Sequence, residues 1–168
     1  MPLTGKPGVE SRSSNLNHTF VLTFNSDVVS GNASVTAGVG NVSGAPIFAG
    51  KTMTVNLTGV TDVQKIAVTL STVTSSSGQV LPDTFLSVNM MSGDVTGDKT
   101  VNKSDATLPK GQIGMPVTGA NFREDVNVTG AITPADGKLV KSPALTHRAA
   151  KVVYRSRPNP PRSYHSYQ

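Results

Sequence analysis

Residues 94–105 read Asp-Val-Thr-Gly-Asp-Lys-Thr-Val-Asn-Lys-Ser-Asp, and residues 125–136 repeat the pattern as Asp-Val-Asn-Val-Thr-Gly-Ala-Ile-Thr-Pro-Ala-Asp. In both copies, side chains that carry oxygen fall at positions 1, 3, 5, 9 and 12, and an aliphatic residue falls at position 8. A short segment with oxygens at alternate positions can wind around a hard cation. The repeat therefore predicts two loops built to hold divalent metal ions.

The spacing is that of a calcium-binding loop, because calcium takes roughly six to eight oxygen ligands from one short segment. Position 7 of such a loop contributes a backbone carbonyl, and the aliphatic residues at position 8, Val101 and Ile132, can pair the two loops through a short strand contact. We therefore expect up to two bound Ca²⁺ ions. The alternative is two polar Asx turns in a segment rich in loops.

Residues 93–98 and 101–105, followed by Asn-Phe-Arg-Glu-Asp-Val-Asn at 121–127, resemble a type I dockerin domain. The resemblance covers about residues 92–142 and implies two calcium loops, each followed by a helix. It implies these ligands: Asp94, Thr96, Asp98, Thr100 (carbonyl), Asn102 and Asp105 in the first loop, and Asp125, Asn127, Thr129, Ala131 (carbonyl), Thr133 and Asp136 in the second. It also implies a cohesin-like partner that faces Lys103, Ser104, Pro134 and Ala135.

Several residues depart from the family pattern. Thr96 replaces an Asn or Asp, and Lys99 occupies the position where a sharp turn prefers glycine. The second loop keeps its glycine but has two carboxylates against three in the first, so we expect the first loop to bind calcium more tightly. Pro109 should disrupt the helix after the first loop, because proline lacks an N–H and clashes with the preceding turn. The Ser-Thr pair with which many dockerins bind cohesin is absent from positions 10 and 11 of both loops.

Residues 8–92 have the pattern of strands and turns. Apolar residues alternate with polar ones around Phe20–Phe24, Met53–Leu57, Ile66–Leu70 and Leu86–Met90, and Val35 and Ala37 follow the same period. About seven short strands separated by Gly, Asn, Asp and Ser predict an antiparallel β-sandwich of immunoglobulin-like or fibronectin-like size. Within it, the segment from Asn56 to Pro82 is similar to the β-sandwich modules that precede dockerin-like ends in large secreted bacterial proteins. The fold class is therefore mainly β, with 1–7 as a lead-in, 8–92 as the sandwich and 93–142 as the paired-loop module.

The net charge of +5 comes from the end of the chain. Basic and acidic residues balance before residue 143, and the tail at 143–168 carries the excess together with Pro and Tyr, so we expect a disordered basic tail. The charge therefore does not indicate a nucleic-acid partner. The chain has no cysteine, no apolar run long enough for a membrane span and no visible signal peptide.

No catalytic constellation is present in the sequence, since no histidine is placed beside a nucleophile and the aspartates belong to the loop pattern. We therefore expect a non-catalytic module. The dockerin resemblance implies that it is extracellular or on the cell surface, at the C-terminal end of an exported bacterial protein. The resemblance links it to polysaccharide degradation through a cohesin-type partner. Two alternatives stay open: a structural, adhesin-like repeat of a larger surface protein that calcium only stiffens, or a gene fragment without function.

Overall fold

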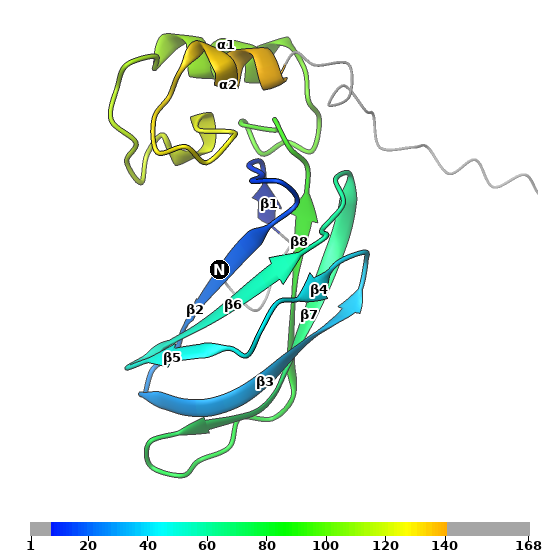
Figure 1. Cartoon of the computed structure of the whole chain (residues 1–168), viewed down its shortest axis with the longest axis vertical. Helices are drawn as coiled ribbons and strands as arrows, with labels where there is room; N and C mark the ends of the chain where they lie inside the picture. The colour runs from blue at the N-terminus through cyan, green and yellow to red at the C-terminus, as the bar shows by residue number, and fades with distance from the viewer. Residues whose placement is uncertain (1–7, 141–168) are drawn as a thin grey trace, which may run out of the picture.

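The computed structural model describes residues 8–140, which form two β-sheets with a small helical part at one end (Figure 1). The predicted lead-in at 1–7 and the predicted disordered tail at 143–168 lie outside these residues. The strands are β1 (Gly8–Glu10), β2 (His18–Thr23), β3 (Val28–Ala37), β4 (Asn41–Val42), β5 (Ile47–Ala49), β6 (Thr52–Thr58), β7 (Gln64–Ser75) and β8 (Thr84–Met90). The helices are α1 (Lys103–Gly111), the short 3-10 helix η1 (Phe122–Glu124) and α2 (Pro134–Val140).

The two sheets have different strand orders. One runs β1-β8-β7-β3, and the other runs β2-β6-β4, with β5 also paired to β6. The prediction of a β-rich fold is confirmed, and most neighbouring strands are antiparallel as expected. The pair β1 and β8 is an exception, because it runs parallel with Gly8 opposite Val88. A three-residue strand carries too little pattern to reveal its direction in the sequence.

The apolar alternation places one face of each strand in a core shared by both sheets. The inward side chains of β6, β7 and β8 are buried, among them Met53, Val55, Ile66, Val68 and Val88. Phe20, Leu22 and Phe24, on and just after β2, pack against this core but stay partly exposed. Ala37 was predicted to face inward and is exposed, because a register irregularity between Val35 and Ala37 shifts the end of β3.

The helical part is built on the repeated loops. Each loop leads into a helix, and α1 and α2 lie side by side (Figure 1). The expectation that Pro109 would disrupt the first helix is wrong, since α1 continues through it to Gly111 and the ring is buried. No helix in residues 8–140 is both long and apolar enough to cross a membrane.

The sheets and the helical part meet in a second buried cluster. Val95, Val101, Val126 and Val140 pack there with Met91, which follows β8, and Val9 of β1 packs against them. Backbone hydrogen bonds continue the junction: the Gly93 N–H donates to the Ser11 carbonyl at 2.7 Å, and the Ser13 N–H donates to the Val126 carbonyl at 3.0 Å. The two repeated loops are thereby fixed to the end of the β1–β8 pair.

Candidate metal centre

Four aspartates lie at the ends of the two loops, and all four are buried. Asp94, Asp105 and Asp136 have 0% exposure and Asp125 has 3%. Aspartate is almost never fully buried without a partner, because removing a carboxylate from water is costly. The partners in residues 8–140 are hydrogen-bond donors, and none of the four forms an ion pair with Lys, Arg or His there.

In the first loop, backbone amides turn inward toward the carboxylate at position 1. Asp94 Oδ1 accepts from the N–H groups of Gly97 (2.8 Å) and Asp98 (3.1 Å), and Asp94 Oδ2 accepts from the N–H of Lys99 (2.7 Å). Asp105 at position 12 accepts from the N–H of Thr96 through Oδ1 (2.9 Å) and from the N–H of Asn102 through Oδ2 (2.8 Å). The amides hold both carboxylates in one orientation.

The second loop repeats this arrangement at positions 3, 5, 6 and 9. At position 4 the loops differ, because the Gly97 N–H donates to Asp94 Oδ1 whereas the Val128 N–H donates to the Asp125 backbone carbonyl (3.3 Å). Asp125 accepts from the N–H groups of Thr129 (2.9 Å) and Gly130 (2.9 Å), which hold positions 5 and 6. Asp136 accepts from the N–H groups of Asn127 (3.3 Å) and Thr133 (2.8 Å), which hold positions 3 and 9. The sequence repeat is therefore also a repeat of hydrogen bonds.

The backbone conformation repeats as well. Positions 4 and 6 have positive φ in both loops: Gly97 (76°) and Lys99 (71°) in the first, and Val128 (56°) and Gly130 (84°) in the second. Left-handed backbone is unfavourable for Lys and Val, whose Cβ approaches the following carbonyl oxygen. The conformation is kept because it aims the amides at positions 5 and 6 toward the first aspartate.

Position 3 brings a further oxygen close to each carboxylate pair. In the first loop, Thr96 Oγ1 lies 3.3 Å from Asp94 Oδ1 and 2.9 Å from Asp105 Oδ1. In the second, one terminal atom of the Asn127 amide lies 3.1 Å from Asp125 Oδ1, 3.1 Å from Asp136 Oδ1 and 2.9 Å from Thr129 Oγ1. The oxygen and nitrogen of an amide have the same shape, so this atom is either a nitrogen donating to three oxygens or a fourth oxygen among them.

This donor set fits a calcium ion. Oxygens that share one calcium lie about 3 Å from each other, because each is roughly 2.3–2.6 Å from the ion. The separations around Thr96 and Asn127 have this size. In residues 8–140, no three His, Cys, Asp or Glu side chains gather at one place, so the remaining ligands would be hydroxyl, amide and carbonyl oxygens. Calcium accepts all three kinds.

The other predicted ligands have roles within the loops. Asp98 Oδ1 accepts from the Thr100 N–H (2.8 Å), so this third carboxylate is turned toward its own loop. The position 7 carbonyls also accept hydrogen bonds, that of Thr100 from the Asn102 side chain (3.4 Å) and that of Ala131 from the Thr129 hydroxyl (3.2 Å). Both position 9 side chains accept a helix N–H: Asn102 from Ser104 (2.8 Å) and Thr133 from Ala135 (3.3 Å).

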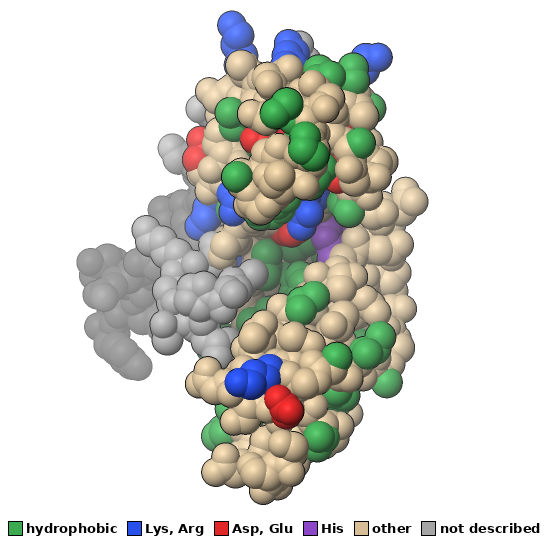
Figure 2. All heavy atoms as spheres, turned by 90° about the vertical axis from the view of Figure 1, so that its left-hand side faces the viewer, with side chains coloured by type: hydrophobic (Ala, Val, Ile, Leu, Met, Phe, Trp, Pro, Cys, Tyr) green, Lys and Arg blue, Asp and Glu red, His purple; other side chains and the backbone are tan. Residues whose placement is uncertain are grey.

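The four predicted partner-facing residues occupy the exposed first turns of the helices. Lys103 and Ser104 begin α1, and Pro134 and Ala135 begin α2. Figure 2 shows Lys and Arg side chains projecting from the helical end, whereas charges are sparse over the sheets on that face.

The expected strand contact between Val101 and Ile132 is not formed. The Ile132 carbonyl accepts from the Gly114 N–H (3.1 Å), and Ala131 pairs with Pro116. The loop between the helices supplies this pairing, which a comparison of the two repeats alone could not reveal.

Sequence reasoning assigned no role in the site to three residues beside the loops, namely Arg12, Phe122 and Arg123. The Arg123 guanidinium lies so close to Gly97 that a side chain there would collide with it. Arg12 lies over the Phe122 ring, 4.8 Å from its centroid, and is paired with Glu10 (2.9 Å). Only Gly97 gave a signal, since a glycine inside a polar loop often marks positive φ or close backbone approach.

No protein-family model, curated protein or solved structure matches the chain.

Proposed function

We propose that residues 94–136 form a paired, dockerin-like calcium-binding module and that the protein is non-catalytic. One observation carries the proposal: each loop buries two aspartates among inward-turned amides, with the same hydrogen bonds from the amides at positions 3, 5, 6 and 9 and the same positive φ positions in both copies. Asp94, Thr96 and Asp105 would hold an ion in the first loop, and Asp125, Asn127 and Asp136 would hold one in the second. The carbonyls of Thr100 and Ala131 belong to the proposed sets. So do the side chains at positions 5 and 9, which are Asp98 and Asn102 in the first loop and Thr129 and Thr133 in the second.

The energetic reason for binding is the charge that each loop carries. Two like charges brought near the same hydroxyl or amide repel each other, and burial strengthens the repulsion. A bound calcium ion would supply positive charge directly to the two carboxylates of each loop, which form no ion pair with a Lys, Arg or His side chain of residues 8–140. Binding to the folded state alone stabilises it by about 4 kcal/mol when calcium exceeds its dissociation constant a thousandfold.

We further propose that the module is extracellular and docks a partner through the exposed first turns of α1 and α2. The dockerin resemblance points to a cohesin-type domain and to polysaccharide degradation. A second candidate, a structural repeat that calcium stiffens, is favoured by the junction, where Val9 and Met91 pack with Val95 and Val126 and Ser13 bonds to Val126. This junction would transmit the ordering of the loops to the sheets.

Isothermal titration of the full chain with calcium tests the metal proposal. We expect two sites in the wild type, and one site each in Asp94→Asn and Asp125→Asn, because each change removes one carboxylate from one loop. Asp83→Asn is the control, since Asp83 is exposed and lies outside both loops. Absence of any binding heat at millimolar calcium, with no bound metal found by elemental analysis, would refute the proposal.

Capture on an immobilised type I cohesin separates the two candidate functions. Retention in calcium that is lost in a chelator supports docking. If the titration finds calcium sites but no cohesin retains the protein, the result supports the second candidate function, a structural repeat that calcium stiffens. The double variant Lys103→Glu with Ala135→Glu should abolish retention while the titration still finds two calcium sites, because both side chains are exposed and neither supplies a proposed ligand.

A further inference from the structure

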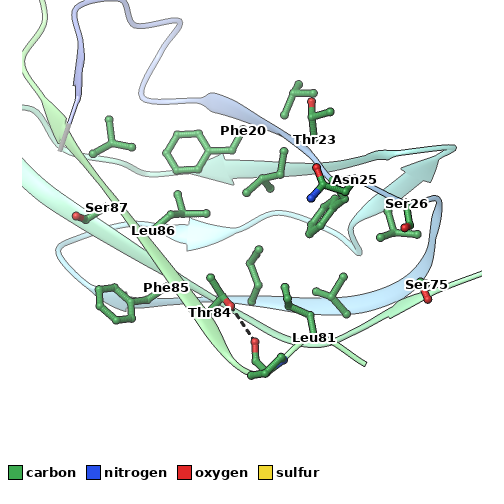
Figure 3. Close-up of a pocket in the computed structure, with 18 of the residues that line it drawn as sticks. Phe20, Thr23, Asn25, Ser26, Ser75, Leu81, Thr84, Phe85, Leu86 and Ser87 are labelled. Carbon is green, nitrogen blue, oxygen red and sulfur yellow. Dashed lines mark hydrogen bonds between the residues drawn. The ribbon is translucent and has the colours of Figure 1, made fainter. Parts of the chain in front are cut away.

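Charged side chains gather where the sheets meet the loops, whereas the space between the sheets is mostly apolar. A groove of about 1170 Å³ opens between the two sheets, and Figure 3 shows Phe20 of β2 and Leu86 of β8 in its lining. Of the described residues that line this groove, Glu10 alone is charged, and it is paired with Arg12. Figure 2 shows basic and acidic side chains between the sheets and the helical end. The charged groups that can act on the loops therefore lie at the junction.

Arg123 reaches from the start of the second loop to the first loop. It belongs to η1 and lies two residues before Asp125, the first residue of the second loop. Its guanidinium Nη1 occupies the space that a Cβ atom would need at Gly97, position 4 of the first loop. The expected contact between Val101 and Ile132 is not formed. Arg123 therefore links the two loops in a way that the residues at position 8 do not.

The contact falls at the position where the two loops differ. The Gly97 N–H donates to Asp94 Oδ1 at 2.8 Å, whereas the Val128 N–H of the second loop donates to the Asp125 backbone carbonyl at 3.3 Å. Both residues have positive φ, so a change of backbone hand does not explain the difference. Gly97 has no Cβ, which leaves room for the guanidinium beside this amide. Arg123 thus lies against an amide that holds the first aspartate of the other loop.

The Arg123 side chain is also attached to the side of the sheets. Its guanidinium carbon lies 5.9 Å from the centroid of the Phe122 ring, and that of Arg12 lies 4.8 Å from the same centroid. A guanidinium within about 6 Å of an aromatic ring is attracted by it. Arg12 is in turn bound to the Glu10 carboxylate through Nε at 2.9 Å and Nη2 at 3.3 Å. The position of Arg123 therefore depends on η1, which carries both the ring and the guanidinium.

The charge of Arg123 acts on the first loop in two opposite ways. Within residues 8–140, Arg123 forms no ion pair with Asp or Glu. Its positive charge attracts the carboxylate of Asp94, which accepts the amide beside it, but it also repels an incoming cation. The affinity of the first loop alone therefore does not separate position from charge. The coupling between the loops does, because the charge of Arg123 is the same whether the second loop is filled or empty.

We propose that Arg123 is a positioning residue that couples the two metal loops. The inference rests on the calcium-binding function proposed above. An ion in the second loop fixes Asp125 and, with it, η1, so that Arg123 stays against Gly97 and the Gly97 amide stays on Asp94. The first loop is then ordered before its own ion binds. By linkage the effect is mutual, so each ion binds more tightly when the other loop is filled.

Isothermal titration of the full chain with calcium measures this coupling. The overall binding constant of the wild type is compared with the product of the constants of Asp125→Asn, which keeps the first loop, and Asp94→Asn, which keeps the second. We expect the wild-type constant to exceed the product by at least about fivefold, the lower end of typical coupling between sites. Two sites with no excess over the product would overturn the proposal. A titration that finds no site would instead refute the calcium function itself.

Two substitutions at the contact should remove the coupling. Arg123→Ala deletes the guanidinium, and Gly97→Ala displaces it with a Cβ atom. Each should bring the overall constant down to the product of its own single-loop constants, and the two changes together should have no further effect on the coupling, because they break the same contact.

Gly130→Ala is the matched control for backbone strain. The φ of Gly130 is 84° and that of Gly97 is 76°, but nothing lies within 4 Å of a Cβ atom added at Gly130. The control therefore brings the strain of a left-handed alanine without the collision, and it should keep the wild-type coupling. Coupling that survives in Arg123→Ala, or that is lost equally in Gly130→Ala, would contradict the role of Arg123.

Hydrogen exchange in a chelator tests the contact without metal. We expect the Gly97 amide to exchange at least about threefold faster in Arg123→Ala than in the wild type, because its bond to Asp94 opens more often once the guanidinium is gone. The Val128 amide bonds within its own loop and should exchange at the same rate in both proteins. Nuclear magnetic resonance resolves the two amides. An equal rate at Gly97 in the two proteins would show that Arg123 does not hold this amide and would overturn the proposal whether or not calcium binds.

Discussion

At the scale of single residues, Lys99 and Gly130 hold the same position in the two loops with unequal ease. Lys99 has φ of 71° and Gly130 has φ of 84°, and both donate their N–H to the first aspartate of their loop. A non-glycine residue in this left-handed region costs roughly 1–2 kcal/mol. At position 6, the backbone of the first loop is therefore strained and that of the second loop is not.

Relief of this strain is measurable. We expect Lys99→Gly to raise the free energy of unfolding by about 1 kcal/mol in the presence of a chelator, after part of the gain is offset by the greater freedom of glycine in the unfolded chain. Urea denaturation of the full chain measures it. Lys99→Ala is the matched control, because it removes the side chain and keeps the Cβ. A gain of the same size in the alanine variant would mean that charge or side-chain entropy, rather than backbone strain, is responsible.

His18 predicts a dependence of stability on pH. Burial lowers the pKa of His18 below its ordinary value of 6.5; Glu10 and Asp62 oppose this shift, and Arg12 adds to it. The unfolded chain therefore takes up a proton at a higher pH than the folded chain does. The contribution of neutral His18 to the free energy of unfolding is fully present above about pH 7. It is lost as the pH falls below about 6.5, between the pKa of His18 in the unfolded chain and its lower pKa in the folded chain.

Urea midpoints between about pH 7 and about pH 5 test the role of His18. We expect His18→Gln to flatten the fall in stability across this range, because glutamine does not titrate. Thr23→Ser, an exposed change at the other end of β2, should keep the wild-type slope. Equal slopes in the wild type and His18→Gln would show that other groups cause the dependence.

At the scale of elements, α1 begins with a capping box. The Asn102 side chain accepts from the Ser104 N–H (2.8 Å), and the Asp105 carboxylate accepts from the Asn102 N–H (2.8 Å). Each bond satisfies an amide at the helix start that has no partner within the helix. The carboxylate of the cap is also the last aspartate of the first loop. Folding of the helix and ordering of the loop are therefore coupled.

Removing the cap should weaken this coupling. We expect Asn102→Ala to lower the free energy of unfolding by about 1 kcal/mol in a chelator, the usual effect of losing an N-cap side chain. Differential scanning calorimetry measures the change. Lys103→Ala, one residue on, is exposed and should change stability by less than half of that amount. A larger effect in Lys103→Ala than in Asn102→Ala would contradict the capping role.

The elements also show where sequence reasoning succeeds and fails. Apolar alternation predicted the core faces of β6, β7 and β8, because a strand with one buried face must repeat every second residue. The direction of β1 and the open groove were not predictable, since a three-residue strand has no period and strand order depends on distant contacts. The prediction that Pro109 would disrupt α1 was wrong, because intrinsic helix propensity predicts little where tertiary packing buries the proline.

The same limit applies to the loops. The repeat of oxygen-bearing side chains at fixed positions predicted which residues lie in each loop, because this spacing is visible directly in the sequence. The inward-turned amides and the burial of all four aspartates could not be read from side-chain types. The contact of Arg123 with Gly97 joins two separate parts of the dockerin-like pattern, and their spacing in the sequence does not predict that they meet.

At the scale of the whole molecule, the junction connects the second loop to the sheets. The Val126 carbonyl accepts from the Ser13 N–H at 3.0 Å, and the Val126 side chain is buried in the cluster that Val9 of β1 joins. Val126 is the second residue of the second loop, directly after Asp125. Anything that orders this loop therefore also restrains the segment between β1 and β2.

We expect calcium to slow hydrogen exchange in β1 and in Ser11–Ser13, as well as in the loops, because the proposed ion holds Val126 in place. Ser13→Pro removes the amide that bonds to Val126, so calcium should then protect the loops alone. Ser13→Ala keeps the amide and should retain the wild-type pattern. Mass spectrometry of exchanged peptides with and without calcium measures both. If protection of β1 persists in Ser13→Pro, the buried cluster around Val9 and Met91 transmits the effect without the hydrogen bond. If protection in the wild type is confined to the loops, the sheets do not respond to calcium.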